Sequence, residues 1–164
     1  MIGSILQISI SPGGVPKRAI AEAAVTAEGL RGDAWAHPEF HGGPNQAVLL
    51  MTSEGLDELR AEGFAVFPGA LGENFTTRGL DRRNIRIGQR FRAGEALIEI
   101  SKLRSPCATL YVYGAGIHAA VYDDQVKAKD PSSPRWGLGG FYARVIRGGT
   151  VRTHDIIQLI DQVV

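Results

Sequence analysis

The sequence contains a single cysteine, Cys107, among 164 residues. One cysteine excludes an intrachain disulfide, so a reducing cytoplasm is the expected location. The sequence also lacks any apolar run that approaches the roughly 20 residues of a membrane span. Residues 1–11 alternate apolar and polar side chains and carry no basic segment ahead of an apolar one. This stretch therefore predicts a strand, and no signal peptide is expected.

The sequence also has no excess of charge of one sign. The 18 basic and 17 acidic residues give a net charge of +1, with no long basic run. Proteins that follow nucleic-acid phosphates usually present a basic face, so DNA or RNA binding is not expected. Lysine is scarce: only four of the 18 basic residues are lysine, and the other fourteen are arginine. The arginine fork suits carboxylates and phosphates and so favours a small anionic ligand, although an arginine-preferring genome would produce the same bias.

A zinc-ligand cluster is also absent from the sequence. His37 and His41 are four residues apart, but Pro38 between them is incompatible with the helix that would bring them together. One cysteine and four scattered histidines give no set of ligands with metal-binding spacing, so a dedicated zinc site is not expected.

Glycine is abundant, with 21 residues that fall mostly in pairs and at turns, which indicates many short strands. Apolar alternation and short apolar runs predict strands near 6–10, 46–51, 85–87, 96–100, 142–146, 151–152 and 157–159. Gly148-Gly149 suits a hairpin turn between two of them. Ser53 is expected to cap a short helix, other helices are expected only between about 106 and 126, and 127–134 is a candidate flexible lid. We therefore predict one mainly β domain over 1–164, a β-barrel with a few short helices.

Cys107 lies in the most informative local sequence. Ser105 is a good N-cap and Pro106 suits the first helical position, which predicts Cys107 in the first turn of a helix. There the helix dipole and the nearby Arg104 would lower the pKa of the thiol, and a thiolate can ligate a soft metal or attack electrophilic sulfur. A small buried hydrophobe is the more frequent role of a free cysteine, and spacing alone favours that role.

Two glycine loops offer further candidates. Gly42 and Gly43 can take positive φ and turn successive N–H groups inward as a nest for an anion, with His41 as a proton donor beside them. Glu73 has the chemistry of an acid/base group, and Asn74 that of a ligand donor or a turn residue. On local grounds a plain turn with a hydrogen-bonded histidine is favoured for the first loop, and a turn role is favoured for Asn74. For Glu73 the residues alone favour neither alternative.

Arg144 alternates with Tyr142 on one face of its predicted strand. If that face points into a barrel, the guanidinium must pair with a carboxylate or meet an anion. The sequence alone does not decide between a carboxylate and an anionic ligand as the partner of Arg144.

Together these pieces resemble the MOSC family, the C-terminal module of molybdenum-cofactor sulfurases. The match consists of six motifs in family order, spread over most of the chain: Gly14–Lys17, Gly29–Asp33, His41–Leu50, Pro68–Asn74, Arg104–Cys107 and Gly139–Val145. Each motif alone is weak, but the ordered set favours the functional role of the cysteine. The chain departs from the family pattern at Gln89 and His154, which stand in two positions where family members often have Gly-Asp. Leu138 also stands where a basic residue is common.

The resemblance implies a closed β-barrel like the C-terminal barrel of pyruvate kinase, and binding of the molybdenum cofactor (molybdopterin). It makes Cys107 the catalytic residue and molybdenum ligand. The expected cofactor-binding residues are Lys17, His41, Gly42, Gly43, Glu73, Asn74, Arg104 and Arg144. No pyridoxal phosphate is expected, because that group belongs to a desulfurase domain of larger relatives.

Small bacterial members of the family look like reductases of N-hydroxylated bases. The resemblance therefore implies an oxidoreductase with a small-molecule substrate, served by an electron-donor or desulfurase protein. Two alternatives stay open: a sulfur carrier that uses a Cys107 persulfide, and a non-catalytic molybdopterin-binding or sensor domain. All three would use the same cysteine loop.

Overall fold

The computed structural model describes residues 1–35, 38–39 and 42–161. Its strands are β1 (Ile2–Ile10), β2 (Arg18–Ile20), β3 (Glu22–Thr26), β4 (Gly29–Leu30), β5 (Val48–Thr52), β6 (Phe75–Arg78), β7 (Arg90–Ala93), β8 (Ala96–Leu103), β9 (Phe141–Arg147), β10 (Gly149–Arg152) and β11 (Ile156–Asp161). The α-helices are α1 (Ser53–Ala61), α2 (Ile117–Val121) and α3 (Asp124–Lys127), and the 3-10 helices are η1 (Pro44–Gln46), η2 (Arg82–Asn84) and η3 (Ala108–Tyr113). The predicted mainly β class is confirmed.

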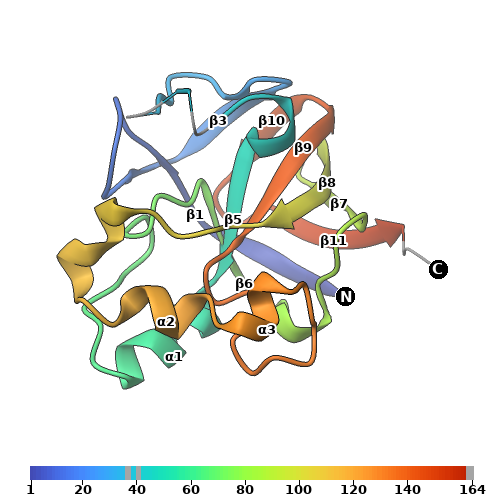
Figure 1. Cartoon of the computed structure of the whole chain (residues 1–164). Helices are drawn as coiled ribbons and strands as arrows, with labels where there is room; N and C mark the ends of the chain where they lie inside the picture. Colours follow the sequence, from blue (N-terminus) through green and yellow to red (C-terminus); the bar gives the residue numbers. More distant parts are fainter. Residues whose placement is uncertain (36–37, 40–41, 162–164) are drawn as a thin grey trace.

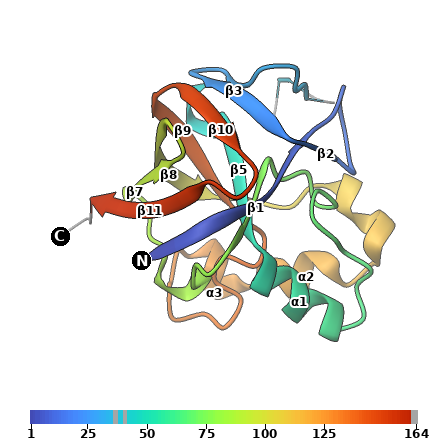
Figure 2. The same cartoon turned by 180° about the vertical axis from the view of Figure 1, so that it is seen from behind.

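Within the described residues, seven strands close into a barrel in the order β11-β7-β8-β9-β5-β6-β1, because β1 pairs back with β11. The pairing of β5 with β6 is parallel, whereas the other neighbours run antiparallel. A smaller sheet of β10, β3 and β4 lies at one end of the barrel, and α1, α2 and α3 gather at the other (Figures 1 and 2). The predicted closed barrel with short helical additions is therefore confirmed.

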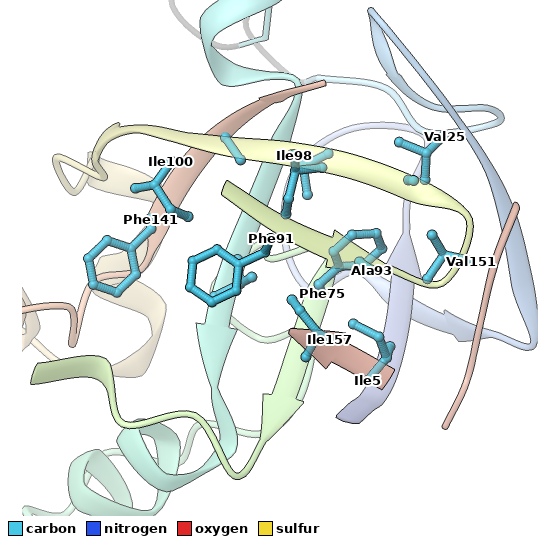
Figure 3. Close-up of a cluster of buried hydrophobic side chains, with 14 of the residues drawn as sticks. Ile5, Val25, Phe75, Phe91, Ala93, Ile98, Ile100, Phe141, Val151 and Ile157 are labelled. Carbon is cyan, nitrogen blue, oxygen red and sulfur yellow. The ribbon is translucent and has the colours of Figure 1, made fainter. Parts of the chain in front are cut away.

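Alternate residues of the strands fill the barrel interior. Ile98 and Ile100 of β8, Phe91 of β7, Phe75 of β6 and Phe141 of β9 are fully buried and point toward one another (Figure 3). This two-residue period was readable in the sequence because successive side chains of a strand point to opposite faces. A second apolar cluster lies beneath the helices, where Leu56 and Leu59 of α1 are buried.

Three local predictions were wrong. Ile85 and Ile87 form no strand: η2, capped by the Asp81 carboxylate, ends just before them, and Gln89 closes a turn by accepting from the Arg86 N–H at 2.7 Å. The helix α1 is capped by Thr52, one residue before the predicted Ser53. The third error concerns the strands on either side of Gly148.

The strands β9 and β10 form no hairpin with each other, since they belong to different sheets. Gly148 and Gly149 serve a close backbone approach instead. A Cβ on Gly148 would lie 2.6 Å from the Val25 carbonyl oxygen, and one on Gly149 would lie 2.8 Å from the Glu95 backbone. The glycine pair therefore marks the point where the chain passes from the barrel to the smaller sheet.

Candidate functional site

One pocket brings together residues that are far apart in the sequence. It contains about 460 Å³ of space, part of it open to solvent. Its polar lining includes Lys17, Arg104 and Cys107, and most of its other walls are apolar or aromatic. Three of the residues expected at the site are thus brought together.

Cys107 enters this pocket from an extended segment. Its φ of −118° and ψ of 173° make it the residue before η3, so the predicted position inside a first helical turn was wrong. The reason is that the chain after β8 stays extended while the Arg104 N–H bonds to the Gly140 carbonyl at 3.0 Å. The sulfur is half-buried, and Sγ lies 2.8 Å from Oγ1 of Thr109. The thiol therefore opens on a pocket and is not sealed in the core.

The carbonyl of Cys107 is also held in place. It accepts from the Leu110 N–H at 3.1 Å, and it lies 2.8 Å from Nε2 of His118, whose ring stacks on Tyr111. These contacts fix the backbone of Cys107 on the side that leads into η3.

Arg104 is a buried cation with an unfilled donor. Its side chain donates through Nη2 to the Leu71 carbonyl at 2.7 Å and through Nη1 to the Gly139 carbonyl at 3.3 Å. Its Nε is buried without a hydrogen-bond partner. Within the described part of the chain, no carboxylate forms an ion pair with this guanidinium. A buried, incompletely bonded cation at a pocket wall is suited to an anionic ligand.

Lys17 reaches the pocket as one half of a buried ion pair. Its Nζ lies 2.5 Å from Oδ2 of Asp33, and both side chains are almost fully buried. Burial lowers the pKa of Lys17, although the carboxylate of Asp33 acts in the opposite direction. The lysine is therefore a fixed ammonium that is less well solvated than a surface lysine.

Asn74 lies behind this pair and does not line the pocket. Its Nδ2 donates to Oδ2 of Asp33 at 2.8 Å and to the Ser9 carbonyl at 3.2 Å, while its Oδ1 accepts from the Leu49 N–H at 3.0 Å. Asn74 is fully buried, and these bonds leave it no free direction toward a ligand. The structure places it as a brace between β1, β5 and the ion pair.

Glu73 is likewise withdrawn from the pocket. Its carboxylate accepts from the N–H groups of Gly69 at 2.7 Å and Leu71 at 3.2 Å and from the Thr76 hydroxyl at 3.0 Å. Complete burial raises the pKa of Glu73, and the hydrogen bonds oppose this rise. The side chain holds the loop that carries Leu71 and Gly72 to the pocket wall.

Arg144 lies outside the barrel. Ala143 and Val145 of the same strand pack on the core, whereas Arg144 is exposed and forms an ion pair with Glu99 of β8. Glu99 also accepts from Arg90 at 2.8 Å, and these two cations, Arg90 foremost, hold the pKa of Glu99 below its usual value. The carboxylate is thus its partner, and the structure does not bring Arg144 to the pocket.

Of the glycine loop, His41 lies outside the described residues. Gly42 and Gly43 have φ of 83° and 84°, which confirms the positive φ. A Cβ on Gly42 would lie 2.4 Å from Nε1 of Trp35. Neither glycine lines the pocket. Gly42 instead packs against Trp35, which does line it.

Sequence reasoning missed the aromatic walls, Trp35 and Tyr142. Lys17 Nζ lies 4.3 Å from the centre of the Trp35 ring. Tyr142 is 4% exposed, and burial raises its pKa. Both residues lie in or next to a glycine-rich motif, and this was the only sequence signal for them. It did not indicate that either ring points into the pocket.

Other features stand apart from the pocket. Ser133, in the segment expected to be a lid, is buried and bonds to Asp123 at 2.8 Å, and no residue of 127–134 is among the pocket residues. Gln89 and His154 also lie elsewhere. Over the described ranges, no helix is long and apolar enough to cross a membrane, and no group of three or more His, Cys, Asp or Glu side chains could hold a metal ion.

Comparison with known proteins gives a family model described as "MOSC domain", which matches residues 37–158. "Protein YiiM" of Escherichia coli K12 is 38% identical over 96% of this chain and 70% of its own length. "Uncharacterized protein YflK" of Bacillus subtilis 168 is 32% identical over 91% of this chain and 64% of its own. A protein named "Reductase" of Gibberella moniliformis is 27% identical over 84% of this chain and 23% of its own.

Solved structures give the same fold. The crystal structure of YiiM from Escherichia coli has a TM-score of 0.71 at 25% identity, covering 98% of this chain and 71% of that one. The YUAD protein of Bacillus subtilis has a TM-score of 0.70 at 19% identity, covering 96% and 94%. The chain thus spans between about a quarter and 70% of the curated relatives named above.

Proposed function

The chain belongs to the MOSC domain family, and from that premise we propose that its Cys107 pocket binds the molybdenum cofactor and that the protein is an oxidoreductase reducing N-hydroxylated compounds. One observation carries the proposal: a half-buried thiol, a buried guanidinium and a buried ammonium line the same pocket. The similarity to a protein named "Reductase" supports the redox half of it.

The residues of the pocket fit this cofactor. A cysteine sulfur is a soft donor appropriate to a sulfur-rich metal centre. Arg104 offers a buried cation whose Nε is unfilled, which suits the negative charge of a phosphate-bearing pterin.

Each residue has a distinct task in this proposal. Cys107 Sγ, which contacts Thr109, would be the protein ligand to the metal. Arg104 and Lys17 balance the negative charge of the bound group, and the apolar Leu49 and Leu71 restrict the entry of water. The bound cofactor supplies the electron transfer, while the chain supplies orientation and electrostatics.

Reduction of an N–OH group to N–H and water consumes two protons and two electrons, and the electrons would come from an electron-donor protein. We assign Lys17 Nζ as a proton donor because it lines the same pocket as Cys107. Burial lowers the pKa of Lys17 and so favours release of a proton, whereas the Asp33 carboxylate opposes it. Tyr142 is the less suitable donor, since burial raises the pKa of its phenol. Asp33 holds Nζ in place during this transfer.

The test is elemental analysis of protein purified anaerobically from cells with intact cofactor biosynthesis. The wild-type protein should contain molybdenum and pterin, and Cys107→Ser should lose the molybdenum. Arg144→Gln is the matched control and should retain it, because Arg144 pairs with Glu99 outside the pocket. Wild-type protein free of molybdenum would contradict the proposal.

The other two functions predict different results. A sulfur carrier would gain the mass of one sulfur after incubation with a cysteine desulfurase and would need no molybdenum. A non-catalytic sensor would bind pterin with an affinity that survives Cys107→Ala.

A further inference from the structure

Exposed isoleucines gather on the outer surface of β1 and β11. Ile2 of β1 is 58% exposed, and Ile156 and Ile160 of β11 are 59% and 47% exposed. Ile2 lies opposite Gln158 in the ladder, so Ile156 is its diagonal neighbour on the same face. Figure 2 shows the two strands side by side. We call this apolar cluster of Ile2, Ile156 and Ile160 the Ile156 face.

Arginines flank the Ile156 face. Three of them are exposed, and each lies opposite an outward residue of a neighbouring strand: Arg78 opposite Ser4, Arg92 opposite Gln158, and Arg147 opposite Leu97. Within the described part of the chain, no carboxylate forms an ion pair with any of these three. At adjoining positions Arg90 and Arg144 share the carboxylate of Glu99. Among these side chains five arginines thus stand against one glutamate, in a chain whose net charge is only +1.

The Ile156 face lies on the opposite side of the barrel from the Cys107 pocket. The pocket walls Leu49 and Tyr142 belong to β5 and β9, which pair with each other. In the closed order of strands, β11 is separated from β9 by β7 and β8, and from β5 by β1 and β6. A molecule bound at the Ile156 face therefore leaves the pocket open.

An apolar cluster beside arginines has the composition of a protein interface. Such interfaces place apolar side chains at their centre, and arginine is enriched in them. A planar guanidinium can pair with both oxygens of one carboxylate, which a partner surface rich in Asp and Glu would offer. Single exposed isoleucines are ordinary, but three neighbouring ones beside cations form a patch that a complementary surface can cover.

Two other occupants fit this surface less well. A second copy would bring like arginines together across a two-fold axis, and like charges in contact weaken an interface. A membrane-surface site usually places tryptophan, tyrosine or phenylalanine at the lipid boundary, whereas none of the outward residues named above is aromatic.

We propose that the Ile156 face is the docking site of a second protein, whose surface carries carboxylates around an apolar centre. The isoleucines pack against that centre, while Arg78, Arg92 and Arg147 pair with the carboxylates. Docking does not depend on the reaction at Cys107, because the two sites lie on opposite sides of the barrel.

The first measurement is the affinity of the whole chain for a random copolymer of glutamate and tyrosine, which presents carboxylates beside apolar rings. Arg92→Glu should weaken this binding about 5- to 30-fold, since one attraction is lost and one repulsion is added. Lys127→Glu changes the net charge equally at an exposed position of α3, and it should change the affinity less than about 2-fold. Equal losses in the two variants would overturn the proposal, because the polymer would then respond to net charge alone.

The apolar part is tested by comparing the copolymer with polyglutamate. Ile156→Ser should weaken binding of the copolymer about 5-fold and leave binding of polyglutamate unchanged, because only the copolymer has apolar groups to bury. Val112→Ser is the matched control, since Val112 is 74% exposed on η3, and it should leave both affinities unchanged. A copolymer affinity that Ile156→Ser does not alter would show that the isoleucines take no part, and would contradict the docking site.

Two further assays decide between the occupants. Sedimentation equilibrium should show a monomer, whereas a dimer that Ile156→Ser dissociates would assign the face to a second copy. The wild-type protein should also stay in solution when phosphatidylglycerol vesicles are sedimented. Binding to these vesicles that Ile156→Ser abolishes would assign the face to a membrane surface. Either of these assignments would overturn docking of an acidic protein.

Discussion

Asn74 makes three hydrogen bonds from a fully buried position, and its replacement by alanine measures how much the brace behind the pocket contributes. The change removes the acceptor of the Leu49 N–H and one donor each to Ser9 and Asp33. Asp33 keeps Lys17 and the Ser11 N–H as partners, so the missing hydrogen bond costs Asp33 less than it costs the Leu49 N–H or the Ser9 carbonyl.

The magnitude follows from the groups left behind. A buried polar group without a partner costs about 1–3 kcal/mol, and the Leu49 N–H and the Ser9 carbonyl are the two affected most. We therefore expect Asn74→Ala to lower the free energy of unfolding by about 2–4 kcal/mol, a large part of the roughly 5–15 kcal/mol of a typical domain.

Urea denaturation followed by circular dichroism measures this difference. Asn84→Ala is the matched control, because Asn84 is exposed and its amide lies 3.4 Å from Asp81 Oδ2; it should change the free energy of unfolding by less than about 0.5 kcal/mol. A loss below about 1 kcal/mol in Asn74→Ala would refute the role of Asn74 as a buried brace.

Three further predictions concern Glu73, Arg144 and the glycine pair Gly42 and Gly43. Burial raises the pKa of Glu73 above its ordinary value of 4.5, so the folded state binds this proton more tightly than the unfolded state. The free energy of unfolding should therefore fall as pH rises from about 4.5 through the raised pKa, and Glu73→Gln should flatten this slope in denaturation curves; parallel slopes would contradict the assignment. Arg144→Gln breaks a half-exposed ion pair and should lower the free energy of unfolding by less than about 1 kcal/mol without loss of molybdenum, whereas lost metal would return Arg144 to the site. Gly43→Ala carries backbone strain alone, while Gly42→Ala adds a clash with Trp35, so only the latter should also change the tryptophan emission; equal spectra would show that this contact is absent.

The fold was predictable because its signals are local. The alternation at Ile98 and Ile100 and the continuous apolar run of β5 depend only on which faces a strand buries. The errors arose where tertiary contacts decide. Ile85 and Ile87 alternate without pairing, and the glycines at 148–149 serve a backbone approach between sheets.

The site was predictable in part, for a related reason. Cys107, Arg104 and Lys17 could be recognised from their motifs. Whether another polar residue of such a loop lines the pocket or holds the backbone behind it depends on contacts with distant parts of the chain. Asn74 bonds to Ser9, 65 positions away, which no local pattern reveals. Trp35 contacts Lys17 and Gly42, so its position in the pocket wall can be read only from the folded chain.

X-ray absorption at the molybdenum edge tests the central claim most directly, because it counts the sulfur atoms bound to the metal. In protein loaded with the cofactor, the metal should show one sulfur ligand more than the metal of the free cofactor. Equal sulfur counts for the bound and the free cofactor would contradict coordination by the cysteine on which the proposed function depends.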